Sequence, residues 1–147
     1  MSDDLVATLE TILERLEALG IPYMIVGSIA ALAHGRARST QDFDLVVDID
    51  AERAAALVDA LPADRFYASK DAALDAVRRS TMFNVIDLKT GWKIGLVPLK
   101  RRPFSAQEFR RRQPVELLGV RAYVATIEDV VLAKLEWSKS AGGSASI

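Results

Sequence analysis

The chain has 147 residues, half of them hydrophobic and 27% charged, which fits one folded domain with an ordinary core and excludes a disordered chain. Its formal net charge of -1 points to neither a nucleic acid nor an acidic partner, and the absence of cysteine excludes disulfides and thiolate metal sites. The acidic N-terminus lacks the pattern of a signal peptide, and no apolar run approaches the ~20 residues of a membrane span. We therefore expect a cytoplasmic protein of bacterial type.

Hydrophobic periodicity, caps and turn residues predict a chain of alternating helices and strands. Leucine and isoleucine recur at spacings of three and four from Leu5 to Leu19, which is typical of one face of an amphipathic helix. The expected order is that helix, a strand over 23–27, a helix over 28–35, a strand over 42–49, helices over 51–62 and 70–79, a hairpin over 82–99, a helix over 105–112, a second hairpin or strand pair over 114–125 and a helix over 126–139.

Polar residues at cap spacing support three of these helices. Asp50 is expected to cap the helix over 51–62, Ser105 and Glu108 have the spacing of a capping box, and Thr126 and Asp129 occupy the cap and third positions of the last helix. Helices mixed with hairpins indicate an α+β fold with a mixed central sheet. We expect one domain over 1–139 and a flexible tail of small residues over 140–147.

Two aspartates stand one residue apart at the start of the strand over 42–49. In an extended strand, Asp42 and Asp44 share one face, while Phe43 and Leu45 point to the other face and into the core. Two carboxylates that close repel each other, and a divalent cation removes that conflict. Mg²⁺ prefers such oxygen ligands together with substrate phosphates, and two ions are conceivable. The alternative is a solvated edge strand that carries two charges.

The junction between the strand over 23–27 and the next helix is a second candidate site. Gly27 permits a tight turn, and the free N–H groups at the following helix start favour an anion, to which Ser28 adds a hydroxyl. The alternative is a structural role, in which the glycine forms the turn and the serine caps the helix.

Together the two features, "VGSIAALAHGRARSTQDFDLVV", resemble the signature of the DNA polymerase β-like nucleotidyltransferase superfamily. With "FNVIDLKTGWKIGLV" and "TIEDVVLAKLEWSK", the chain is similar, over roughly residues 5 to 140, to stand-alone bacterial nucleotidyltransferase-like proteins related to the AbiEii toxin family. The resemblance implies a minimal nucleotidyltransferase fold and Mg²⁺-dependent transfer of a nucleoside monophosphate from an NTP to an acceptor. A toxin role would follow from analogy alone.

The resemblance also assigns site residues. Asp42 and Asp44 would bind the metal and serve as the catalytic carboxylates. The nucleotide and its phosphates would be bound by Gly27, Ser28, Arg38, Thr40 and Lys134. Arg38 and Lys134 could equally be solvated surface residues. The acceptor stays open among RNA, protein and small molecules, because a fold does not determine a substrate.

The chain departs from the family pattern at one important position. Relatives place a third carboxylate in a stretch that here reads "KIGLV", with Gly95 where Asp is expected. Asp87, across the predicted hairpin, could replace it only if the register brings it near the pair. The alternative to an enzyme is therefore a degenerate nucleotidyltransferase fold that binds a nucleotide or a partner. Relatives also continue beyond "SAGGSASI", so a truncated chain is a further interpretation.

Other residues have weaker functional signals. His34, the only histidine, could act as a base near the phosphate site but suits the end of a short helix equally well. Trp92 and Trp137 are typical packing residues. The segment Lys100–Arg112 has six basic residues and one acidic, with Phe104 and Phe109 among them, so it could contact nucleic acid or be a solvated helix face anchored by its phenylalanines. Oligomeric state is not indicated.

Overall fold

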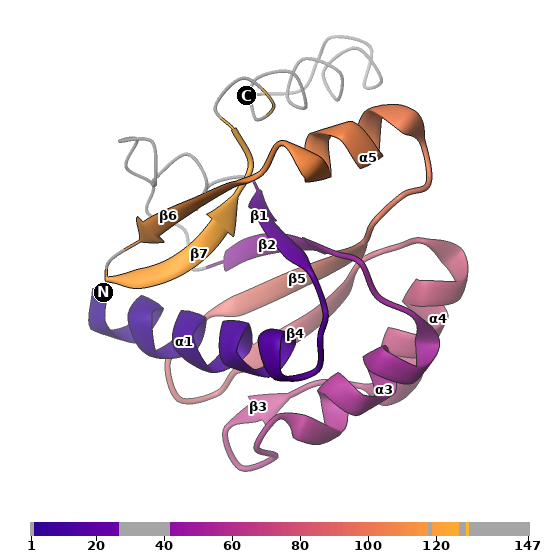
Figure 1. Cartoon of the computed structure of the whole chain (residues 1–147). Helices are drawn as coiled ribbons and strands as arrows, with labels where there is room; N and C mark the ends of the chain where they lie inside the picture. The colour runs from indigo at the N-terminus through magenta and orange to yellow at the C-terminus, as the bar shows by residue number, and fades with distance from the viewer. Residues whose placement is uncertain (1, 27–41, 118, 127–128, 130–147) are drawn as a thin grey trace, which may run out of the picture.

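The computed structural model describes residues 2–26, 42–117, 119–126 and 129 of the chain. Within these residues it has four helices and one seven-stranded sheet (Figure 1). The helices are α1 (Ser2–Ala18), α3 (Ala51–Ala60), α4 (Lys70–Arg79) and α5 (Pro103–Arg110). The strands are β1 (Tyr23–Val26), β2 (Asp42–Val47), β3 (Phe66–Tyr67), β4 (Phe83–Asp87), β5 (Lys93–Pro98), β6 (Gln113–Leu117) and β7 (Val120–Val124).

The sheet is mixed, as the sequence predicts. Its strand order is β3-β4-β5-β2-β1-β7-β6. Strand β2 runs parallel to β5, and β1 runs parallel to β7, while the other neighbours are antiparallel. Both expected hairpins are present, since β4 pairs with β5 and β6 pairs with β7. The first hairpin turns at Gly91, whose φ of 83° is a conformation that favours glycine.

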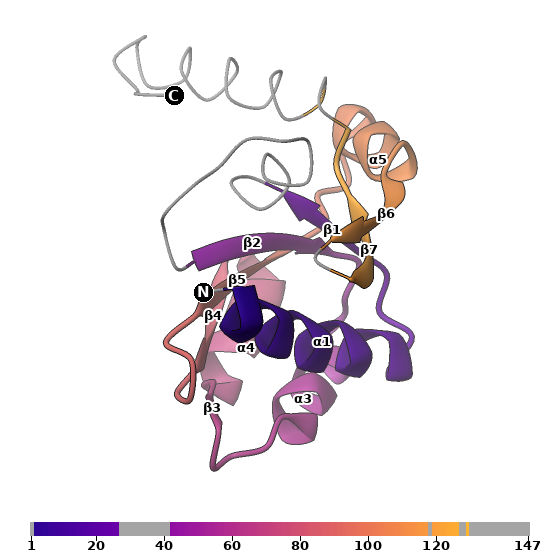
Figure 2. The same ribbon diagram turned by 90° about the vertical axis from the view of Figure 1, so that its left-hand side faces the viewer.

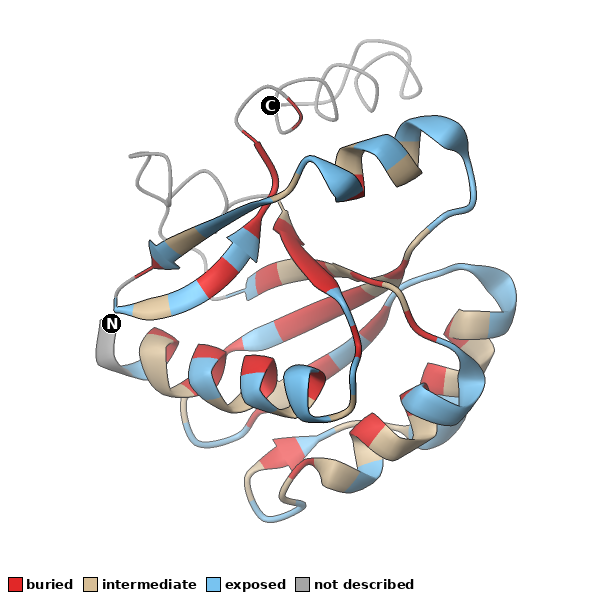
Figure 3. Ribbon diagram, viewed as in Figure 1, coloured by how far each residue is buried: buried red, intermediate tan, exposed pale blue. Residues whose placement is uncertain are grey.

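One face of the sheet carries the hydrophobic core. Helices α1, α3 and α4 lie on this face, and α5 lies on the other side (Figure 2). The apolar stripe of α1, from Leu5 to Leu16, is buried against the sheet, as are Phe43 and Leu45 of β2. Figure 3 shows the same division, with buried residues on the inner sides of the helices and along the central strands. The predicted alternation of β2 is therefore confirmed.

Local capping explains where some of the helices begin. The Asp50 carboxylate accepts a hydrogen bond from the Arg53 N–H, which confirms the predicted cap of α3. Thr126 likewise accepts a bond from the Asp129 N–H at 3.1 Å. The Ser105–Glu108 capping box is wrong, because α5 begins two residues earlier, with Pro103 in its first turn and Arg102 as an N-cap without a side-chain bond.

Parts of the predicted chain lie outside the described residues, including the helix over 28–35 and most of the helix over 126–139. The two-residue strand β3 was not predicted, because it is shorter than the periodicity that identifies a strand. Among the described residues, no helix is long and apolar enough to cross a membrane.

Candidate functional site

The two aspartates lie at the start of β2, on the face of the sheet opposite the core. Asp42 is exposed and Asp44 is half-buried, and both carboxylates leave the strand on the same side. In the parallel register with β5, Asp42 lies beside Lys93 and Asp44 lies beside Gly95. On the other side, Asp44 pairs with Val26, the last residue of β1. The pair thus lies on the central strand β2, which is hydrogen-bonded to β5 on one side and β1 on the other, a rigid support for a site.

The electrostatics of this pair are unfavourable when no cation is present. Burial raises the pKa of Asp44, and the neighbouring Asp42 carboxylate raises it further, while Lys93 acts in the opposite direction. No hydrogen bond to either carboxylate is present within the described part of the chain. A half-buried carboxylate with a raised pKa and a like-charged neighbour is typical of a ligand-binding position.

Gly95 has consequences for the shape of the site. A β-carbon at this position would lie 2.4 Å from the Met82 Sδ and 2.5 Å from the Asp44 Oδ1. The space in which a third carboxylate would begin is therefore filled by a thioether and by the carboxylate of Asp44. The position that the sequence singled out does lie directly beside the pair, and its side chain is missing.

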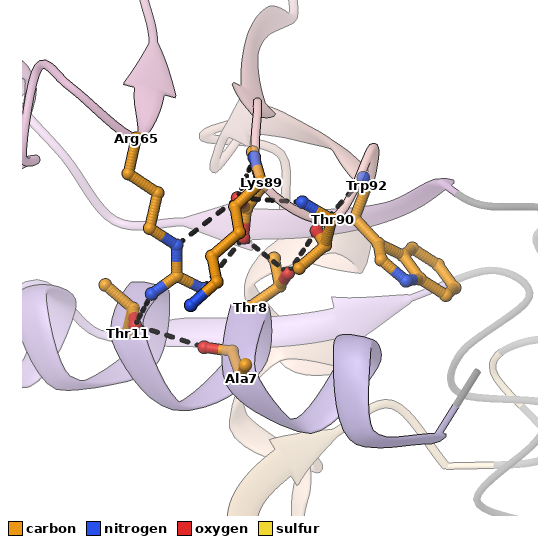
Figure 4. A network of polar contacts seen from close by, with 8 residues as sticks. Ala7, Thr8, Thr11, Arg65, Lys89, Thr90 and Trp92 are labelled. Atoms are coloured by element: carbon orange, nitrogen blue, oxygen red, sulfur yellow. Dashed lines mark hydrogen bonds and ion pairs between the residues drawn. The ribbon is translucent and has the colours of Figure 1, made fainter.

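Asp87 does not replace this third carboxylate. It is completely buried, at the end of β4, and its carboxylate accepts a hydrogen bond from Thr8 of α1, which lies on the core side of the sheet. Figure 4 labels Thr8 and Arg65, two of its partners. Arg65 donates two bonds, at 2.9 and 3.3 Å, and Thr8 of α1 donates one at 2.7 Å. Burial alone would raise the pKa of Asp87, but these bonds and one from the Lys89 N–H lower it to about 2. The role that the sequence left open for Asp87 is a structural one.

The donor chemistry of the pair fits a hard cation. Two carboxylates on one strand face supply the oxygen ligands that Mg²⁺ takes when substrate phosphates complete its shell. Among the described residues, no group of three or more His, Cys, Asp or Glu could hold a metal. The five residues predicted to bind the nucleotide lie outside the described residues: Gly27, Ser28, Arg38, Thr40 and Lys134. His34 and Trp137 also lie outside them.

The remaining candidates can be placed. Trp92 is buried and packs against Phe43, with ring centroids 5.8 Å apart, so it is a packing residue. In the basic segment, Phe109 is buried as an anchor, whereas Phe104 is 41% exposed. Sequence reasoning missed the ion pair between Arg111 and the buried Asp129, at 2.7 and 3.1 Å. An arginine and an aspartate 18 residues apart give no sequence signal for such a contact.

Comparison with known proteins supports the fold. In sequence, neither a family model nor a curated protein matches the chain. A candidate nucleotidyltransferase from Thermotoga maritima superposes with a TM-score of 0.65 at 15% identity, over 95% of this chain and 88% of that one. An antigenic nucleotidyltransferase-like protein from Paracoccidioides brasiliensis gives 0.57 at 18% identity, over 87% and 63% of the two chains. The chain therefore has the nucleotidyltransferase fold.

Proposed function

We propose that this chain is a Mg²⁺-dependent nucleotidyltransferase, which transfers a nucleoside monophosphate from an NTP to an acceptor. The observation that carries the proposal is the pair of Asp42 and Asp44, on the face of a nucleotidyltransferase-fold sheet opposite the core. The similar solved structures support the fold, and the motifs around the pair support the DNA polymerase β-like superfamily. A closer relation to the AbiEii family is part of the proposal and rests on the sequence motifs alone.

The metal would be held by the two carboxylates. Burial of Asp44 and repulsion from Asp42 disfavour the negative charge of Asp44, and a bound cation would relieve both effects. One or two Mg²⁺ ions would complete their shells with oxygens of the triphosphate and water. When bound, the metal supplies electrostatic stabilisation to the phosphates and to the leaving pyrophosphate.

Residues of the chain would bind and orient the nucleotide. Gly27 and Ser28 are assigned to the phosphates, and Arg38, Thr40 and Lys134 are assigned to assist them. Lys93 adds a cation that sequence reasoning did not include. It is exposed, lies in register with Asp42, and has no ion-pair partner within the described residues, so it is available to an anionic group of the substrate.

Gly95 is the residue that favours a protein without catalytic activity as the alternative to an enzyme. Without a third carboxylate at this position, the pair could bind a metal and a nucleotide without transferring it, and the protein would then be a nucleotide-binding or regulatory module. The acceptor, whether RNA, protein or a small molecule, is left open by the residues near the pair.

The test combines binding with transfer. Thermal melts with Mg²⁺ and a non-hydrolysable NTP should show stabilisation of the wild type, which Asp42→Asn and Asp44→Asn each remove. Asp64→Asn is the matched control, because Asp64 is an exposed loop aspartate that makes no ion pair within the described residues. α-Labelled NTPs incubated with Mg²⁺ and cell RNA, protein or metabolite fractions should then transfer label.

Each outcome decides between the alternatives. Label transfer that both Asp variants abolish and the control keeps supports the enzyme. Binding without transfer supports the degenerate module. If Asp42→Asn and Asp44→Asn bind Mg²⁺ and nucleotide as the wild type does, the proposed site is wrong.

A further inference from the structure

The basic residues of the chain are distributed unevenly. Six of its 19 basic residues and one of its 20 acidic residues lie within 100–112, so this segment has a net charge of +5 and the remaining residues together have -6. A short segment with an excess of positive charge in an otherwise acidic protein suggests a polyanion partner, provided that its cations are exposed and not paired with carboxylates.

Several of these cations are free to contact a partner. Lys100, Arg102 and Arg110 are exposed and form no ion pair with any residue that the structure describes. Arg101 makes a contact of 3.6 Å with Asp48, and its side chain stays 81% exposed. Arg111 forms an ion pair with the buried Asp129, and Arg112 donates a hydrogen bond to the Phe109 carbonyl, so these two are less available to a partner.

Aromatic side chains lie among these cations. Phe104 and Arg110 are on the solvent face of α5, and Phe104 is 41% exposed. At the end of the helix, the Arg112 guanidinium lies 4.3 Å from the Phe109 ring centroid and 5.0 Å from that of Tyr123, which is 37% exposed. Figure 3 shows α5 as largely exposed, on the outside of the molecule. A single exposed phenylalanine is common on protein surfaces, so Phe104 is informative here because exposed cations without ion-pair partners among the described residues surround it in the sequence.

We propose that this basic face, defined as Lys100, Arg101, Arg102, Phe104 and Arg110, binds single-stranded nucleic acid. Lysine and arginine contact phosphates without regard to sequence, and an exposed aromatic ring stacks on unpaired bases. A duplex offers no free base to Phe104. An anionic membrane would need a wider apolar surface, and Phe104 is the single exposed large hydrophobic residue of the segment.

The basic face has a defined position relative to the aspartate pair. Its first residues lie at the end of β2 opposite the pair, because Arg101 contacts Asp48 and the Leu99 N–H bonds the Val47 carbonyl. Helix α5, which carries Phe104 and Arg110, lies on the side of the sheet away from α1, α3 and α4 (Figure 2), and Asp42 and Asp44 leave β2 on the face opposite the core. At ~3.3 Å per strand residue, β2 separates them by roughly 20 Å, or about six nucleotides stacked at ~3.4 Å.

The experiment is a titration by fluorescence anisotropy, without NTP or Mg²⁺, so that it is independent of the proposed catalytic function. Labelled single-stranded RNA and DNA of about 16 nucleotides are the probes, since a single binding site spans up to about that length. Lys100→Gln, Arg102→Gln and Arg110→Gln are combined in one variant. At ~0.7 per phosphate contact, the slope of log affinity against log salt should become shallower by about 2. Phe104→Ala alone should weaken binding about fivefold or more.

A matched control separates this face from general charge. Arg53→Gln, Lys70→Gln and Arg79→Gln change the net charge equally, at exposed residues of α3 and α4 that have carboxylate partners. This control should bind as the wild type does, and urea midpoints should show that all variants fold. The proposal is overturned if the wild type does not bind single strands at ~50 mM salt, if the control weakens binding equally, or if duplexes or anionic vesicles compete better than single strands. The tighter binder of the two probes identifies whether the natural ligand is RNA or DNA.

Discussion

Two aspartates in one sheet, Asp44 on β2 and Asp87 on β4, have opposite electrostatic surroundings, although both are shielded from solvent at least in part. Strand β5 lies between them, and their side chains leave the sheet on opposite faces. Asp87 accepts bonds from Arg65, Thr8 and nearby backbone N–H groups, and its pKa falls to about 2. Asp44 is half-buried next to Asp42, and its pKa is raised.

This difference in charge compensation indicates that Asp87 supports the fold, whereas Asp44 is suited to bind a ligand. The charge of Asp87 is fully compensated by the protein itself, so this residue joins α1, β3 and β4 and has no capacity left for a ligand. Among the described residues, Lys93 offsets the charge of Asp44 only in part, because the pKa of Asp44 stays raised, and we expect a ligand to supply the rest. A folded chain keeps such an unfavourable arrangement when a ligand relieves it. Four substitutions or conditions test this contrast.

Removing the compensated carboxylate should have the largest effect. Asp87→Ala leaves the mostly buried Arg65 guanidinium and the Thr8 hydroxyl without their partner, and should lower the free energy of unfolding by about 3 kcal/mol, the cost of breaking a buried pair. Urea unfolding at neutral pH measures it. Asp75→Ala, which breaks exposed ion pairs with Arg78 and Arg79, should cost less than about 1 kcal/mol. Equal effects of the two variants would contradict this contrast.

The same network should respond to acid. The pKa of Asp87 is lower in the folded state than its ordinary value of 3.8, so its contribution is present above pH 3.8 and is lost as the pH falls toward 2. A shift of this size corresponds to roughly 2 kcal/mol. Urea midpoints measured across this pH range should fall less steeply for Asp87→Asn than for the wild type. If the urea midpoints of the two proteins fall equally with pH, other carboxyl groups control the loss of stability in acid.

The sequence predicts one of these two regions well and the other not at all. The Asp42–Asp44 face follows from a period of two within six residues. Position 95 lies beside Asp44 through the parallel pairing of β2 with β5, which the family resemblance indicates and local periodicity does not. The Asp87 network depends on Thr8, 79 residues away, and on Arg65, which no local pattern connects to it. The Arg111–Asp129 pair was missed for the same reason. Local periodicity predicts faces and turns, whereas contacts between distant side chains depend on packing.

Adding a third negative charge at position 95 should increase the electrostatic repulsion around Asp44. Gly95→Asp places a third carboxylate beside Asp44. The Met82 thioether and the Asp44 carboxylate must both move to admit it, and Gly95→Asn has the same shape without the charge. In metal-free buffer we expect the Asp variant to be about 1 kcal/mol less stable than the Asn variant, at the upper end for like charges on neighbouring strands. With Mg²⁺ the order should reverse. Thermal melts with chelator and with Mg²⁺ measure both, and a Mg²⁺-independent difference would argue against a metal at this position.

Removing the uncompensated charge should stabilise the protein slightly. A raised carboxyl pKa means that the folded state binds protons more tightly than the unfolded chain, so Asp44 in its charged form opposes folding and stability rises as the pH falls through that range. Asp44→Asn should therefore raise the free energy of unfolding in chelator by about 0.5 kcal/mol. Asp42→Asn, which removes the same repulsion from an exposed position, should raise it less. Both variants should lose the stabilisation that Mg²⁺ and a nucleotide give the wild type. A lower melting temperature for Asp44→Asn in chelator would mean that this carboxylate, like Asp87, supports the fold rather than a ligand.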